Sequence, residues 1–175
     1  DVVDLYVDLF QATQYEVGHL WQENRITVAE EHMATAITQY VMAQVYSRFE
    51  ERDSVRGRVV ITGIEGELHQ VGANMVADVI DARGWDVRFL GTNLPHAGVL
   101  QAIEDHRADT VGISATTLLS IPKAVRLVEG IRHKFQSACP RIILGGRAFF
   151  STPTLAQELK ADGPAMDLRS ALALI

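Results

Sequence analysis

Apolar side chains recur at helical spacing through about the first fifty residues. Leu5, Phe10 and Val17 lead into Leu20, and a second apolar stretch occupies residues 33–49. Residues three or four apart lie on one face of a helix, so each stretch predicts a helix that packs one face against a neighbour.

A capping signal separates these two stretches. Thr27 and Glu30 have the spacing of a capping box, in which each side chain accepts a hydrogen bond from the other residue's backbone N–H. We therefore expect a long helix to begin at Val28 and to end at about Glu50.

Charged residues interrupt the apolar pattern after this helix. The run Glu50–Asp53 is followed by Arg56 and then by a new apolar segment, which predicts a short exposed linker. We expect a helical cap domain over residues 1–53 and a second domain over residues 57–175.

The second domain alternates short apolar runs with helical patterns. The expected strands are 59–61, 87–90, 111–113 and 142–144, with a weak fifth near 165–166. The expected helices are 71–82, 97–106 and a segment that follows Pro122. Strands that alternate with helices need right-handed crossovers, and these build a parallel sheet covered on both faces.

The fold class follows from this alternation. We expect an α/β, flavodoxin-like (Rossmann-like), doubly wound five-stranded parallel sheet with strand order 2-1-3-4-5. A small helical-bundle cap precedes it. Because a four-helix bundle takes roughly 80 residues or more, we expect this cap to be truncated, with its first helix trimmed or lying outside this chain.

Composition narrows the class of protein. With 47% hydrophobic and 22% charged residues and no long apolar run, the chain is typical of soluble globular proteins and not of membrane spans. A net charge of −6 argues against direct nucleic-acid binding by this segment. The single cysteine, Cys139, fits a reducing compartment, so we expect a cytoplasmic protein.

Glycine and polar residues follow three of the expected strands. They are Glu67–Gly72 after the first, Ser114–Thr117 after the third, and Gly145-Gly146 after the fourth. In a doubly wound sheet, ligands bind beyond the carboxyl ends of the strands where strand order reverses. We expect these loops to meet at one crevice, with small residues leaving room for a bulky ligand.

Glu67 and His69 have a spacing with chemical meaning. A histidine that ligates a metal usually donates its other ring N–H to a carboxylate. No second ligand with zinc spacing occurs nearby, so a single histidine suits a metal that brings its own other ligands. The alternative is a solvated glutamate beside a histidine that caps the following helix.

These loops resemble the signatures of cobalamin-binding domains. Glu67–Gly72 resembles their Asp-x-His-x-x-Gly run, Ser114 the serine of their Ser-x-Leu motif, and Gly145-Gly146 their glycine pair. Two positions depart from the pattern: Glu67 replaces aspartate, and Thr116 replaces leucine.

The resemblance implies a role for each residue. His69 would be the lower axial ligand to cobalt, in place of the dimethylbenzimidazole base, with Glu67 hydrogen-bonded to it. Gly72 would mark the closest approach of the cofactor. Ser114, Gly145 and Gly146 would line the slot for the displaced nucleotide tail. Thr116 would be a cofactor-binding residue that places a hydroxyl at a packing position.

The cap resembles a second, narrower family. Trp21, nine further residues and then Glu31-His32 are similar to the cap signature of adenosylcobalamin photoreceptors of the CarH and LitR kind. The resemblance implies that Trp21 packs against the adenosyl group and that Glu31 and His32 help to hold it. The alternative is a core tryptophan, a solvated glutamate and an interior histidine with satisfied hydrogen bonds.

One position of the cap departs from the best-known photoreceptors. Gln22 stands where they have the histidine that binds cobalt after illumination. His19 and His32 are therefore the candidates for the upper ligand in the light state.

These resemblances support several functions. The leading hypothesis is an adenosylcobalamin-binding light sensor, not an enzyme, in which photolysis of the cobalt–carbon bond changes cap packing or homo-oligomerisation and signals through an output domain or protein partner. The main alternative is a corrinoid methyl carrier of a cobalamin-dependent methyltransferase system. A third is an α/β interaction module that has lost its cofactor. A sensor that also carries a bilin stays open; the bilin need not be covalent, since Cys139 lies far from the cap.

Overall fold

The structure is a computed structural model that describes residues 2–49, 55–152 and 154–175. Contacts divide the chain into two compact units, Asp1–Glu51 and Arg52–Ile175. The linker expected at Glu50–Asp53 lies outside the described residues, so the domain limits at 53 and 57 stay predictions.

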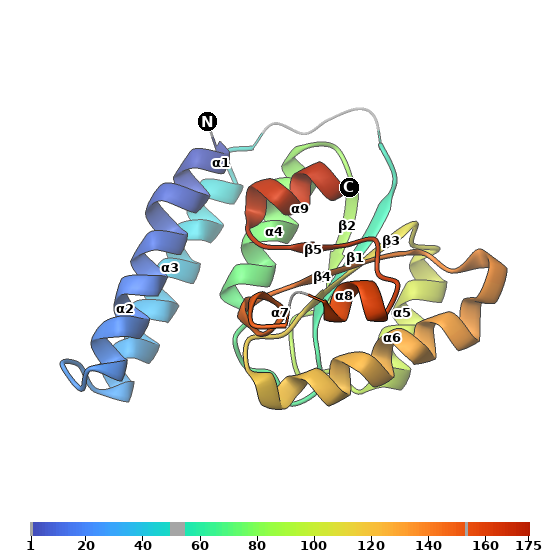
Figure 1. Ribbon diagram of the computed structural model, residues 1–175. Helices are drawn as coiled ribbons and strands as arrows, with labels where there is room; N and C mark the ends of the chain where they lie inside the picture. Colours follow the sequence, from blue (N-terminus) through green and yellow to red (C-terminus); the bar gives the residue numbers. More distant parts are fainter. Residues whose placement is uncertain (1, 50–54, 153) are drawn as a thin grey trace. The chain divides into compact units, whose positions relative to one another are not determined.

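The first unit is a helical hairpin. Its outgoing arm consists of α1 (Val2–Asp4), a π-helical stretch (Leu5–Gln11) and α2 (Ala12–Gln22), and its return arm is α3 (Val28–Tyr46) (Figure 1). An aromatic cluster joins the two arms at the end of the hairpin away from the turn between α2 and α3. The ring of Tyr6 lies 5.2 Å from that of Phe10 and 6.2 Å from that of Phe49.

The start of α3 confirms the predicted capping box. The Glu30 N–H donates to Thr27 Oγ1 at 3.2 Å, and the Thr27 N–H donates to Glu30 Oε2 at 2.8 Å. The helix ends at Tyr46, earlier than predicted. Ser47 accounts for the difference, because its hydroxyl donates to the Gln44 carbonyl and so competes with the helical hydrogen bonds at this end.

The second unit alternates strands with helices. Its elements are β1 (Arg58–Gly63), α4 (Val71–Ala82), β2 (Asp86–Phe89), α5 (His96–His106), β3 (Thr110–Ser114), a 3₁₀ turn (Leu118–Ser120), α6 (Ile121–Phe135), a second 3₁₀ turn (Gln136–Ala138), β4 (Arg141–Gly145), α7 (Arg147–Phe150), α8 (Leu155–Glu158), β5 (Gly163–Ala165) and α9 (Leu168–Leu174). The strands form one parallel sheet in the order β2-β1-β3-β4-β5. The predicted doubly wound, flavodoxin-like fold is confirmed.

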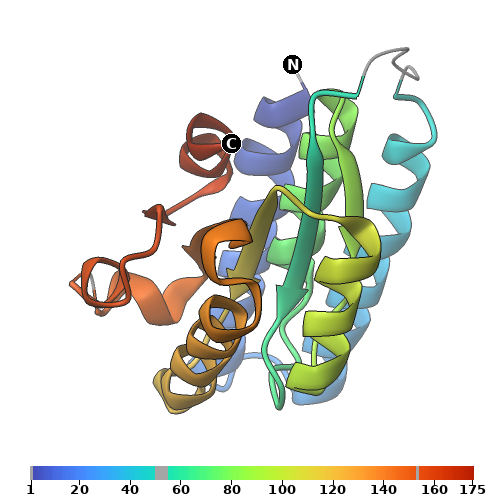
Figure 2. The ribbon, with the colours of Figure 1, turned by 90° about the vertical axis from the view of Figure 1, so that its right-hand side faces the viewer.

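Helices cover both faces of the sheet. Figures 1 and 2 show α4 and α9 on one face and α5 and α6 on the other. The larger core lies on the α5/α6 face and includes the fully buried side chains of Ile113, Leu127 and Leu144. On the opposite face Ile61 of β1 packs with Ala77 of α4. Within the described residues, no helix is long and apolar enough to cross a bilayer.

The larger core supplies a stability prediction. Leu144 is fully buried in the middle of that core. We expect Leu144→Ala to lower the free energy of unfolding by about 2–5 kcal/mol in a denaturant titration, because it leaves a cavity among packed neighbours. Val55→Ala, at an exposed site of the same unit, is the control and should change it by less than about 0.5 kcal/mol. Equal losses in the two variants would contradict this placement of the core.

Candidate functional site

The strand register aligns small residues at the carboxyl edge of the sheet. Gly63 of β1 pairs with Ser114 of β3, Ser114 pairs with Gly145 of β4, and Gly145 pairs with Ala165 of β5. Side chains alternate between faces along a strand, and Ile61, two residues before Gly63, packs on α4. The aligned row therefore faces α4 and α9.

The carboxyl half of the middle strand is only partly covered on that face. Thr110 at the start of β3 is buried there, whereas Gly112 and Ser114 on the same face are only partly buried. A parallel sheet covered by helices usually buries its central strand on both faces. We call this incompletely covered stretch the opening over β3, and Ser114 lies at its end.

The three glycines predicted to bind the cofactor differ in whether the fold itself requires a glycine at that position. A Cβ atom on Gly72 would meet no atom within 4 Å, and on Gly145 the nearest would be the Ala165 carbonyl oxygen at an ordinary 3.6 Å. At Gly146 the φ angle is +94°, and a Cβ would lie 2.3 Å from the Ala115 carbonyl oxygen. The fold alone explains Gly146, while internal packing requires glycine at neither Gly72 nor Gly145.

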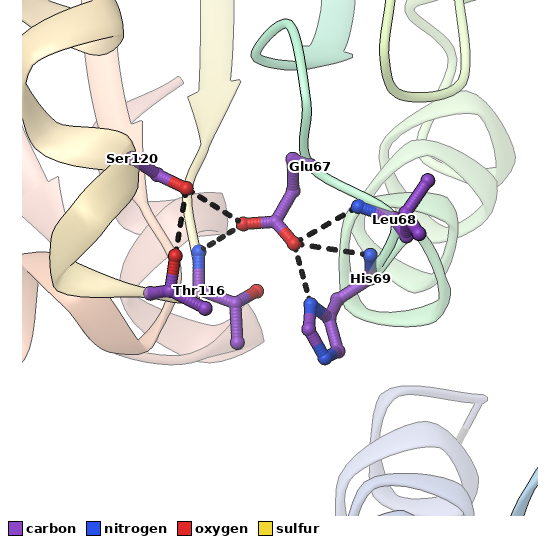
Figure 3. Close-up of polar contacts among 6 residues, drawn as sticks. Glu67, Leu68, His69, Thr116 and Ser120 are labelled. Atoms are coloured by element: carbon purple, nitrogen blue, oxygen red, sulfur yellow. Dashed lines mark hydrogen bonds and ion pairs between the residues drawn. The ribbon is translucent and has the colours of Figure 1, made fainter.

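A buried carboxylate, that of Glu67, links the loop after β1 to the loop after β3. The Glu67 side chain is 2% exposed, although it lies in a loop after β1. Its Oε1 accepts from the N–H groups of Leu68 and His69 at 3.1 Å, and its Oε2 accepts from the Thr116 N–H at 2.7 Å. Figure 3 shows this carboxylate between the two loops.

The same carboxylate holds the His69 ring. Nδ1 of His69 lies 2.5 Å from Glu67 Oε1, and the His69 side chain is 63% exposed. A ring held through Nδ1 ligates a metal through Nε2. Among the described residues there is no group of three or more His, Cys, Asp or Glu that could hold a metal ion. A metal at His69 must therefore bring its other ligands, as the cobalt of a corrinoid does.

The environment of Glu67 favours the ionised carboxylate. Burial acts to raise the pKa of the Glu67 carboxyl, but hydrogen bonds from the His69 ring and from the N–H groups of Thr116 and His69 outweigh it. The pKa falls from its usual 4.5 to about 2. At neutral pH the Glu67 carboxylate is therefore ionised and acts as a hydrogen-bond acceptor. The proton in the contact between the two side chains then lies on Nδ1 of His69.

Ser120 is a site residue that the sequence analysis missed. It is buried, its hydroxyl lies 3.5 Å from Glu67 Oε2, and it also lies 2.8 Å from Thr117 Oγ1 (Figure 3). The available signal was a hydroxyl residue directly before the helix of Pro122 and six residues after Ser114. Thr116, predicted to bind the cofactor, contacts Glu67 through its backbone N–H.

The cap residues form a hydrogen-bonded chain on the hairpin. His32 Nδ1 lies 2.6 Å from Glu31 Oε2, and Thr35 Oγ1 lies 3.1 Å from both Glu31 Oε1 and Gln14 Oε1. In this hairpin the side chains of Trp21 and His32 are exposed. The structure groups Glu31 with His32 and places Gln22 and His19 on the exposed surface of α2.

Three known proteins resemble the chain. A corrinoid protein of Desulfitobacterium hafniense is 24% identical over 151 residues, which cover 84% of this chain and 69% of that protein. The monomethylamine corrinoid protein of Methanosarcina barkeri has the same fold, with a TM-score of 0.81 and 18% identity over 99% of this chain and 82% of that chain. A chain of a methanol:cobalamin methyltransferase complex from the same organism gives a TM-score of 0.53 and 18% identity, over 98% of this chain and 65% of that chain.

Family models match both units. A B12 binding domain model covers residues 57–173, and a second B12 binding domain model covers residues 1–46. The first match spans more than half of the chain and includes every loop at the carboxyl edge of the sheet. The chain therefore belongs to the B12-binding domain family, and its α/β unit is a cobalamin-binding domain.

Proposed function

We propose that this chain is a corrinoid carrier, which binds cobalamin through His69 Nε2 and presents it to a partner methyltransferase. The observation that carries the cobalamin ligation is the 2.5 Å contact between Glu67 and the His69 ring, next to the incompletely covered end of the central strand. The named corrinoid protein and methyltransferase complex support the carrier role and the class of partner.

Glu67 prepares His69 for ligation. When bound, the corrinoid supplies the cobalt that accepts a methyl group and passes it on. The ionised Glu67 carboxylate accepts from Nδ1–H, so the lone pair of the ring lies on Nε2. The donors from Thr116, Leu68 and Ser120 fix the carboxylate in turn, so the ring has one orientation in the absence of any ligand.

The opening over β3 suits the nucleotide tail. Ser114 supplies a hydroxyl at its edge, and the absence of side chains at Gly145 and Gly72 leaves room that packing within the chain does not use. Gly146 contributes the turn that allows the loop after β4 to pass close to Ala115. On this proposal the domain binds the cofactor and the partner performs the chemistry.

A light sensor is the second candidate, and the hairpin favours it. Trp21 and His32 are exposed there, and Glu31, which contacts the His32 ring, lies 3.1 Å from the Thr35 hydroxyl. In this candidate the cofactor is adenosylcobalamin, Trp21 packs against the adenosyl group, and illumination changes homo-oligomerisation. A bilin belongs to this candidate only and would add an absorption band at long wavelength.

The ligand assignment is tested with a histidine variant. We expect His69→Ala to lose the absorption spectrum of histidine-ligated cobalamin and to bind aquacobalamin at least about ten-fold more weakly, because it removes the imidazole that Glu67 holds. His133→Ala, an exposed histidine of α6, is the matched control and should leave both unchanged. An unaltered spectrum in His69→Ala would refute this ligand.

The ionised Glu67 makes stability depend on pH. Because its pKa is about 2 in the folded chain and 4.5 ordinarily, it stabilises the fold by about 3 kcal/mol above pH 4.5. This contribution disappears as the pH falls from about 4.5 towards 2. In denaturant titrations of the cofactor-free chain, Glu67→Gln should lack this loss of unfolding free energy between pH 4.5 and 2. Glu129→Gln, on the surface of α6, should show the same loss as the wild type. The same acid sensitivity in Glu67→Gln and wild type would contradict the assignment.

Carrier and sensor differ in their upper ligand. If the chain is a sensor, it should bind adenosylcobalamin about two- to ten-fold more tightly than methylcobalamin in the dark, because the Trp21 ring packs on the adenine. Trp21→Ala should remove that preference, and Tyr40→Ala, another exposed aromatic of the hairpin, should not. Size-exclusion chromatography before and after green light then checks for a change in assembly. Equal affinities and unchanged assembly would contradict the sensor.

A further inference from the structure

Large apolar side chains gather at the carboxyl edge of the sheet. Leu68 follows β1, Leu118 and Leu119 follow β3, and Met166 follows β5, and all four are exposed. We call these four residues the apolar rim. In the described part of the α/β unit, the one other exposed large apolar side chain is Val55, which precedes β1 at the opposite edge. The apolar exposure of this unit is therefore concentrated where the ligand site lies.

The rim is held in place by the buried carboxylate. The Leu68 N–H donates to Glu67 Oε1, and the Thr116 N–H and the Ser120 hydroxyl donate to Glu67 Oε2 on either side of Leu118 and Leu119. These bonds fix the two ends of the segment that carries the leucines. Leu119 is 91% exposed there, so a ligand can reach it.

We propose that Leu118 and Leu119 bind the corrin ring itself, so that the chain retains affinity for corrinoids that lack a nucleotide tail. This inference rests on the proposed ligation by His69. Leu68 directly precedes His69. Glu67 contacts the loop after β1, the loop after β3 and the imidazole ring of His69. A macrocycle held at His69 therefore lies against the rim. Its periphery bears methyl and methylene groups, which suit leucine side chains that no described residue covers.

The ring is a better occupant of the rim than the tail. The space for the tail is the opening over β3, lined by Ser114 and Gly145. Leu118 and Leu119 lie past the end of that strand and point to solvent. The segment from Thr116 to Ile121 contains no charged residue that could pair with the tail phosphate.

Two corrinoids separate ring contacts from tail contacts. The full chain is titrated with aquacobalamin and with diaquacobinamide, which has the ring but no nucleotide tail, and Kd is read from absorbance. We expect the wild type to bind both, and the double variant Leu118→Ser, Leu119→Ser to bind both about ten-fold or more weakly, because apolar area is lost from the contact with the ring. Thermal unfolding should be unchanged, since both side chains are exposed in the free chain.

Val55→Ser is the matched control, because Val55 is 67% exposed in the same unit but lies at the opposite edge. It should bind both corrinoids as the wild type does. Weaker binding of aquacobalamin alone in the double variant would overturn the proposal, because the leucines would then contact the tail. Unchanged binding of both would also overturn it and would leave the rim as a surface for a protein partner. A wild type that binds neither corrinoid would instead refute the proposed function.

Discussion

The site depends on one buried carboxylate. Removing Glu67 from water costs free energy, and the structure offsets this cost with donors from Leu68, His69 and Thr116 and with the Ser120 hydroxyl. The donors come from loops after two different strands, so the group that orients His69 also fixes how these loops meet. The longer arm of glutamate, where the family signature has aspartate, keeps both functions in one side chain.

Periodicity was sufficient for the fold because every element has a face to bury. Runs such as Val59–Ile61 are apolar on consecutive positions, as a strand covered on both faces must be, and helical spacing resumes at Val71. The limits of elements were less predictable. The end of α3 depends on a hydrogen bond from Ser47, and this competition between side chain and backbone leaves no trace in the apolar pattern.

Site residues were predictable where their chemistry depends on spacing and not where it depends on burial. Glu67 and His69 are two residues apart, so their contact follows from the sequence. Ser120 reaches Glu67 because it directly precedes α6. A serine before an α-helix with proline in its first turn has no spacing that marks it as a site residue. The two glycine signals also look alike in sequence, yet backbone geometry accounts for Gly146 and not for Gly72.

The two units answer different questions about function. In the proposed ligation, His69 of the α/β unit is the lower ligand and Glu67 holds its ring. This arrangement serves a carrier and a sensor equally well, so family membership indicates the cofactor and not its use. The hairpin carries what distinguishes them: an exposed tryptophan and a histidine that Glu31 holds in one orientation. A histidine held in this way has a defined donor or ligand atom without any cofactor present. In the sensor proposal the upper ligand depends on Trp21 and His32, and the two proposed functions differ in that ligand.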